Sequence, residues 1–194
     1  NDRLLKMFLH EIKWNGIKNL QICDFGSGCA HIARSVKKTL KEKAQVTCIE
    51  SNAKVLSFYS NWGLEGKSNV NELADNEYDL IYMVEVIEHL DNPEHTLNCL
   101  KKKLNPKGII FITTPEGRKN ENETNAFDNP AHVHFFTESS LDKLLENCNL
   151  SKLKHVNRNI MHACLEDKRL SKADVIYAKL RSIKKLMGEI KNTI

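Results

Sequence analysis

The sequence lacks any long apolar stretch. No segment approaches the roughly 18 uninterrupted apolar residues of a membrane span, and the N-terminal NDRLLKMFLHEIKW is charged throughout, unlike a signal peptide. These absences argue against a membrane-spanning or secreted protein, and we expect a soluble, cytoplasmic one. Position 1 is Asn and the first residues already have a helical pattern, so the sequence leaves open whether the natural chain begins upstream of position 1. Such an upstream segment could cover a binding site.

Paired cysteines are also missing. The six cysteines are scattered, form no Cys-x-x-Cys pair and show no zinc-site spacing, and several lie inside apolar runs. We therefore expect reduced cysteines packed in a core rather than a disulfide framework or a zinc module.

A strong excess of one charge is absent as well. The net charge is only +4, and many of the lysines and arginines fall in LKKKL (100–104) and KLRSIKKLMGEIK (179–191). A solvated helix face explains such runs more simply than a nucleic-acid surface does, so we do not expect RNA to be a partner.

Short apolar, β-branched segments alternate along the chain with helical patterns. The segments typical of strands are 20–25, 44–50, 78–84 and 108–115, and those typical of helices are 31–43, 52–62, 93–104 and 139–150. This alternation predicts parallel strands joined by right-handed crossovers, hence an α/β protein with a doubly wound, mostly parallel sheet and helices on both faces. Thr137 fits the cap of the last of these helices.

A length of 194 residues with 41% apolar content suits one domain with one core, which we assign to residues 1–165. Residues 166–194 follow a different pattern. Their apolar side chains recur at three- and four-residue spacing, at Ile176, Leu180, Ile183, Met187 and Ile190. This spacing predicts an amphipathic, basic C-terminal helix that packs on the domain or forms a homodimer.

The first predicted strand ends in Asp24-Phe25-Gly26-Ser27-Gly28 and runs directly into a helix. Two glycines one residue apart allow a tight turn and a close approach of the backbone to a ligand, although a purely structural turn has the same pattern. His31 stands where a third glycine would complete a dinucleotide-binding fingerprint, which makes a nicotinamide enzyme less favoured. The second strand ends in Glu50, whose carboxylate can accept both hydroxyls of a ribose.

The predicted strand 78–84 is followed by Glu85-Val86-Ile87-Glu88-His89. If a helix starts there, Glu85, Glu88 and His89 share one face, although an acidic first helical turn needs no chemical role. The polar loop 116–132 leads into a second histidine group, His132 and His134, and can fold over the same sheet edge. Two carboxylates and two imidazoles suit a divalent ion such as Mg²⁺, Mn²⁺, Fe²⁺, Co²⁺ or Zn²⁺; without an ion, His89 or His132 would act as a general base.

These motifs together resemble those of the class I S-adenosylmethionine-dependent methyltransferases. DFGSG (24–28) is similar to their first motif, Glu50 to their ribose-binding acid, and YDLIYMVEVIEHL with LNPKGIIFITTP to their fourth and fifth strands, a likeness that covers roughly residues 17–150. The resemblance implies a Rossmann-like sheet of the seven-stranded type and S-adenosylmethionine as cofactor. It places the methionine part beside Asp24, Gly26, Ser27 and Gly28, and the ribose at Glu50. Asn71 and Glu72 are candidates beside the adenine.

Within this family, the Glu-x-x-Glu-His segment resembles two groups: the ubiquinone-biosynthesis O-methyltransferases and the small-RNA 3′-terminal 2′-O-methyltransferases. Both carry a later histidine, so the resemblance implies a divalent ion held by Glu85, Glu88, His89 and His132, with His134 as a loop or supporting residue. The favoured expectation is O-methylation of a small-molecule hydroxyl. The alternatives are an RNA 3′-terminal 2′-O-methyltransferase, which the modest charge disfavours, and a non-catalytic protein that uses the fold for interactions.

Overall fold

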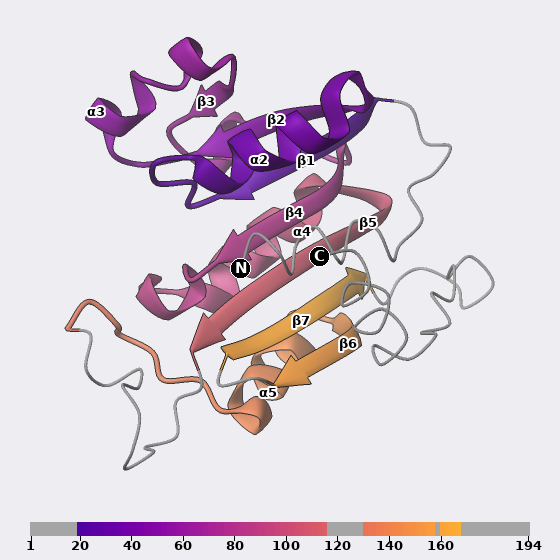
Figure 1. Ribbon diagram of the computed structural model, residues 1–194. Coiled ribbons are helices and arrows are strands. Elements are labelled where there is room, and N and C mark those ends of the chain that lie inside the picture. The colour runs from indigo at the N-terminus through magenta and orange to yellow at the C-terminus, as the bar shows by residue number, and fades with distance from the viewer. Residues whose placement is uncertain (1–18, 116–129, 158–159, 168–194) are drawn as a thin grey trace, which may run out of the picture.

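The computed structural model describes residues 19–115, 130–157 and 160–167, and for residues 153–157 and 160–167 only the backbone. These residues form one seven-stranded sheet with the order β3-β2-β1-β4-β5-β7-β6 (Figure 1). The strands are β1 (Leu20–Phe25), β2 (Ala44–Ile49), β3 (Glu65–Lys67), β4 (Tyr78–Val84), β5 (Leu104–Pro115), β6 (Leu150–Asn157) and β7 (Ile160–Asp167). The pairs among β1 to β5 are parallel, and β7 is antiparallel to both β5 and β6. The predicted doubly wound, mostly parallel sheet is confirmed.

Helices cover both faces of this sheet (Figure 1). The α-helices are α2 (His31–Leu40), α3 (Ala53–Leu56), α4 (Pro93–Lys103) and α5 (Glu138–Asn147). Four short 3₁₀ segments are η1 (Lys41–Lys43), η2 (Ser60–Trp62), η3 (Val70–Glu72) and η4 (Ile87–His89). Thr137 caps α5 as predicted, since its side chain accepts a hydrogen bond from the Ser140 amide.

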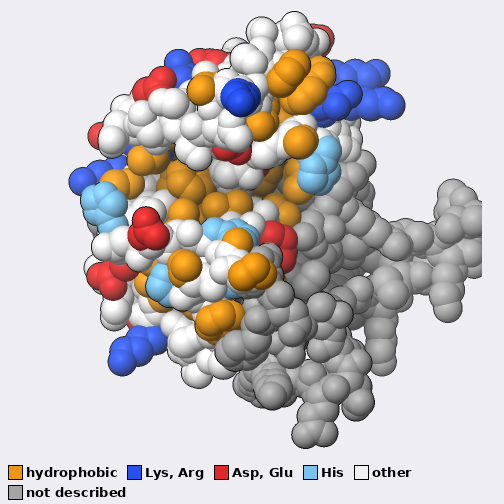
Figure 2. Space-filling view, turned by 90° about the vertical axis from the view of Figure 1, so that its left-hand side faces the viewer, with side chains coloured by type: hydrophobic (Ala, Val, Ile, Leu, Met, Phe, Trp, Pro, Cys, Tyr) orange, Lys and Arg blue, Asp and Glu red, His pale blue; other side chains and the backbone are white. Residues whose placement is uncertain are grey.

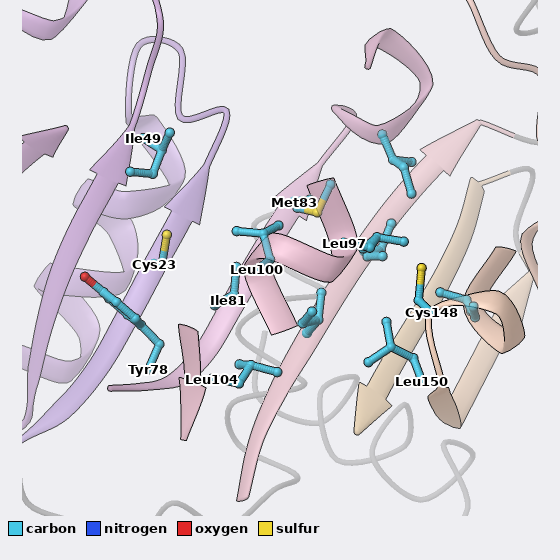
Figure 3. Packing of buried hydrophobic residues seen from close by; sticks show 14 of the residues in the cluster. Cys23, Ile49, Tyr78, Ile81, Met83, Leu97, Leu100, Leu104, Cys148 and Leu150 are labelled. Atoms are coloured by element: carbon cyan, nitrogen blue, oxygen red, sulfur yellow. The ribbon is translucent and has the colours of Figure 1, made fainter. Parts of the chain in front are cut away.

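Two apolar cores lie on the two faces of the sheet. One joins Ile81 and Met83 of β4 to Leu97 and Leu100 of α4 and also includes α5 (Figure 3). The other contains the alternate β4 residues Leu80 and Tyr82, and packs them with Val36 of α2. A strand buried on both faces reads as a continuous apolar run, which is why YDLIYMV was recognisable in the sequence.

The structure departs from the sequence predictions in several segments. The helix predicted for 52–62 is too long: α3 ends at Leu56 and η2 begins only at Ser60, and the chain turns between them so that Tyr59 is buried in the core beside α2. Strand β3, with three residues, is too short to leave a period-two pattern. No segment was assigned in the sequence to the antiparallel strands β6 and β7, although the resemblance implied a sheet of the seven-stranded type.

The boundary proposed between residues 165 and 166 falls inside β7, which extends to Asp167. This boundary is thus misplaced by at least two residues. The division into a domain and a C-terminal helix stays a prediction, because residues 168–194 lie outside the described residues. That helix, with its proposed homodimer contact, and residues 116–129 of the polar loop lie outside the described residues.

Five cysteines of the described part are free, and three of them, Cys23, Cys48 and Cys148, are buried, in agreement with the expected packing of cysteines in a core. In that same part of the chain, no helix has the length and apolar character needed to cross a membrane.

Candidate functional site

The turn after β1 is held by backbone hydrogen bonds to the end of β2. The amides of Gly26 and Ser27 both donate to the Ile49 carbonyl, each at 3.0 Å, and the Ser27 hydroxyl donates to the Asp24 carbonyl at 2.7 Å. Gly26 and Gly28 have φ angles of 77° and 50°, in the left-handed region that favours glycine. The turn thus needs both glycines and sits at the carboxyl edge of the sheet, where ligands bind in such folds.

Glu50 faces this turn from the end of β2. Its Oε2 accepts a hydrogen bond from the Gly28 amide at 2.9 Å, and its Oε1 accepts one from the Asn52 amide at 2.8 Å. A Cβ built on Gly28 would meet no atom within 4 Å, so open space lies beside the turn. The sequence prediction that the glycine turn and Glu50 form one site is compatible with this arrangement.

Tyr59 also supports the turn, which sequence reasoning missed. Its hydroxyl donates to the Gly28 carbonyl at 2.6 Å, while its ring is buried in the core beside α2. No local motif marks this residue, because its role depends on the turn of the chain after α3.

Asp24 lies at the end of β1 with only 3% of its surface exposed. It is the register partner of Tyr82 on β4, and both Asp24 Oδ2 and the Tyr82 hydroxyl are buried without a hydrogen-bond partner in the described part of the chain. Burial raises the pKa of Asp24 to about 7, and the charge of Glu50 acts in the same direction. A cationic ligand group beside it would favour the ionised carboxylate.

The candidates near η3 have different roles. The Glu72 carboxylate accepts hydrogen bonds from the Ser68 amide and hydroxyl and from the Asn69 amide, so it caps this turn. Asn71 is exposed, and its contact with a cofactor stays a prediction.

A second group forms where the loop before α5 lies against η4. The amides of Val133 and His134 both donate to the Glu88 carbonyl, at 2.9 and 3.0 Å. His89 Nδ1 lies 2.8 Å from the carbonyl oxygen of Ala131. Together these bonds fasten the histidine-rich loop to the turn after β4, as the sequence led us to expect.

Glu88, His89 and His132 consequently come together, with one possible ligand atom from each within 4.8 Å of the others. The His89 and His132 ring centroids are 4.8 Å apart, and His132 Nε2 is 4.0 Å from Glu88 Oε1. His134 points elsewhere, since its ring stacks on Phe136. Of the two histidines in the loop, the one singled out by resemblance is the one that joins the group.

The surroundings of this group suit a cation. Glu88 is 1% exposed; its Oε2 accepts a hydrogen bond from the Thr114 hydroxyl at 3.0 Å, whereas its Oε1 is buried without a hydrogen-bond partner in the described residues. Burial raises the pKa of Glu88, and the nearby Glu85 carboxylate acts in the same direction. Because a carbonyl can only accept, the contact with Ala131 places the proton of His89 on Nδ1 and leaves Nε2 as the possible ligand, as in many metal sites.

Glu85 does not belong to this group of three. Its backbone is left-handed, with φ 56°, and its Oε1 accepts a hydrogen bond from the Thr113 hydroxyl at 2.7 Å. The predicted shared helical face was wrong, because η4 begins only at Ile87. Binding of an ion by Glu85 stays a prediction.

Both groups lie at the carboxyl edge of the sheet, toward which the arrows of the parallel strands point in Figure 1. Figure 2 looks onto this edge and shows hydrophobic side chains gathered across its middle, with histidines beside them. The two groups are also linked directly: a Cβ on Gly26 would lie 2.5 Å from a Val86 methyl group, so the turn after β1 packs against the segment after β4.

A sequence model of a methyltransferase domain family matches residues 2–155. The chain belongs to this methyltransferase family. The membership inferred from DFGSG, Glu50 and the Glu-x-x-Glu-His segment is thereby confirmed.

Individual relatives agree with the family. The methyltransferase domain is 31% identical over 117 residues to the ubiquinone biosynthesis O-methyltransferase of Rickettsia bellii, covering 57% of this chain and 49% of that protein. It is 30% identical over 103 residues to the Bartonella tribocorum protein of the same name, covering 50% of this chain and 41% of the other. The chain thus spans about half the length of these curated relatives, or less.

The fold also recurs in a solved structure of an S-adenosylmethionine-dependent methyltransferase from Aquifex aeolicus. The TM-score is 0.66 at 19% identity, covering 84% of this chain and 87% of that one. At this identity the likeness shows the fold alone.

Proposed function

We propose that this chain is an S-adenosylmethionine-dependent methyltransferase. The observation that carries the proposal is the junction of the glycine turn with Glu50, where the Gly28 amide and the Glu50 carboxylate meet beside open space. Membership of the methyltransferase family supports the same assignment. A dinucleotide enzyme remains disfavoured, since His31 still stands where a third glycine would be required.

The residues of the first group would bind and orient the cofactor. Glu50 would accept the ribose hydroxyls, and the turn containing Ser27 and Gly28 would approach the methionine part with its backbone. Asp24 is buried directly before this turn, so its carboxylate would favour the cationic end of the ligand. The sulfonium of the cofactor already makes the methyl group electrophilic, and the chain mainly supplies alignment and exclusion of water.

We further propose that the acceptor is a small-molecule hydroxyl. The similarity to ubiquinone biosynthesis O-methyltransferases supports oxygen as the methylated atom. Glu88, His89 and His132 would hold a divalent ion, with Glu85 nearby, and the buried, unpartnered Glu88 Oε1 fits such a role. A bound ion would supply Lewis acidity, which lowers the pKa of an acceptor hydroxyl. Without an ion, His89 Nε2 or His132 would remove the acceptor proton.

Calorimetric titration of S-adenosylmethionine into the wild type and Glu50→Ala tests the cofactor proposal. Each hydrogen bond to the charged carboxylate is worth about 1.5–3 kcal/mol, so we expect affinity to fall by at least about tenfold. Glu42→Ala removes an exposed carboxylate from η1, which precedes β2 and lies at the opposite edge of the sheet, and should bind normally.

Because Glu50 also holds the turn, the unfolding free energy of each cofactor-free variant should be measured alongside. A wild type that binds no cofactor, or a folded Glu50→Ala that binds equally well, would contradict the assignment. The acceptor class is then tested by product mass after incubation with catechol-like molecules and, separately, with a short RNA.

A further inference from the structure

Thr113 and Thr114 lie directly before Pro115, the last residue of β5, and both are fully buried. Buried hydroxyls need hydrogen-bond partners, and these two find theirs in the carboxylates that follow β4. Val84, the last residue of β4, is the register partner of Thr113, so the parallel pairing of β4 and β5 brings the two segments together.

Each hydroxyl serves a different carboxylate. The Thr113 hydroxyl donates to Glu85 at 2.7 Å, and the Thr114 hydroxyl donates to Glu88 at 3.0 Å. Successive side chains of a strand point to opposite faces of a sheet, so the two threonines draw the two carboxylates apart. This separation agrees with the group of Glu88, His89 and His132, from which Glu85 is absent.

The bond from Thr114 also decides how the Glu88 carboxylate is oriented. It occupies Oε2, while Oε1 is left without a hydrogen-bond partner in the described residues, 4.0 Å from His132 Nε2. A carboxylate turns easily about its last side-chain bond, because that torsion is broad. The hydroxyl therefore fixes which oxygen of Glu88 lies toward the His132 imidazole.

We propose that Thr114 is a positioning residue that aligns Glu88 Oε1 for a divalent ion shared with His89 and His132. This inference rests on the ion proposed as part of the function. The loss of a residue that holds a metal-binding carboxylate in place commonly lowers metal affinity by about 10–100-fold. Thr113 donates its hydrogen bond to Glu85 instead, so the loss of its hydroxyl should lower metal affinity less.

The test is a Co²⁺ titration of the whole chain, followed by calorimetry and by visible absorption of the bound ion. Thr114→Val removes the hydroxyl at nearly constant volume and should weaken Co²⁺ binding by about 10–100-fold and alter the absorption spectrum. Thr114→Ser keeps the hydroxyl and should bind Co²⁺ with an affinity close to that of the wild type. Thr113→Val should lose less than Thr114→Val.

Thr47→Val is the matched control, because it removes a buried threonine whose hydroxyl contacts Glu65 on β3, away from the group. It should bind Co²⁺ as the wild type does. All variants should keep wild-type affinity for S-adenosylmethionine, which separates this inference from the proposed function.

Three results would overturn the positioning role: wild-type affinity in Thr114→Val, equal losses in Thr113→Val and Thr114→Val, or no Co²⁺ binding by a wild type that still binds S-adenosylmethionine. Failure of the wild type to bind S-adenosylmethionine, with Co²⁺ binding intact, would instead overturn the proposed function.

Discussion

Asp24 combines a motif position with an unusual environment. It precedes the glycine turn, yet it is almost fully buried beside Cys48 and Tyr82, and Tyr82 Oη lacks a hydrogen-bond partner in the described residues. An ionised carboxylate without full hydrogen bonding is costly in such surroundings, so the cofactor-free fold favours the protonated acid. The residue therefore links the stability of the chain to pH and to the charge of its ligand.

Asp24→Asn should flatten the pH dependence of stability. The pKa of Asp24 rises from 3.8 to about 7 on folding, so the folded chain holds a proton that the unfolded chain releases between these values. The wild type should therefore lose stability as pH rises from about 4 to about 7, by on the order of a few kcal/mol. Urea unfolding of both cofactor-free proteins at several pH values measures this. Identical pH slopes would show that Asp24 does not titrate in this range.

At the scale of elements, the site depends on contact between two turns that are far apart in the sequence. The turn after β1 carries Gly26, and the segment between β4 and η4 carries Val86, which occupies the space that a side chain at position 26 would need. Gly28 has a similar backbone conformation but borders open space. Gly26 thus allows the two segments to pack closely, whereas Gly28 leaves space beside the turn for a ligand.

Gly26→Ala should destabilise the chain by about 1–3 kcal/mol, because the new methyl group overlaps Val86 and the left-handed backbone is strained for alanine. Adding Val86→Ala should recover part of this loss. Gly28→Ala should cost only about 1 kcal/mol of strain while weakening S-adenosylmethionine binding. Chemical unfolding and calorimetry of the three variants separate the two effects. Equal stability losses in the two single variants would refute this division of roles.

At the scale of the whole molecule, several lysines of the described residues bond to other parts of the fold. In the run at the end of α4, Lys101 donates to the Cys148 carbonyl at the end of α5, and Lys103 bonds the Leu73 carbonyl and the Asp75 carboxylate. Lys37 of α2 similarly bonds the Gly63 carbonyl. Two of the three lysines in LKKKL are thus bonded to other parts of the fold, instead of lying on the fully solvated helix face that the sequence suggested. The absence of an RNA partner stays a prediction.

Titration with a short single-stranded RNA should accordingly give weak binding that disappears as the salt concentration rises, because only a few phosphate contacts are available. Fluorescence anisotropy at several salt concentrations measures this, and the same RNA with a 3′-phosphate serves as the control. Tight, salt-resistant binding that requires a free 3′ hydroxyl would favour the RNA-terminal methyltransferase instead.

Much of the fold could be predicted because its signals are local. The strands 20–25 and 78–84 coincide with β1 and β4, since buried parallel strands leave short apolar runs between helical patterns. The glycine turn and Glu50 could be singled out in the same way, because residues directly after parallel strands lie at the carboxyl edge, where ligands bind in such folds; their contact is seen in the structure. Segments with weak patterns, such as β3, escaped prediction.

The sequence by itself therefore determined the alternation of the central strands and helices along the chain, the family and the residue types at the sheet edge. Only the tertiary structure decided which of those residues meet. Because β4 and β5 pair in this register, the Thr113 hydroxyl bonds Glu85 and the Thr114 hydroxyl bonds Glu88. The packing of the loop on η4 places His132 beside Glu88 and His89. Such partnerships depend on contacts between segments far apart in the chain, which no local pattern of residues encodes.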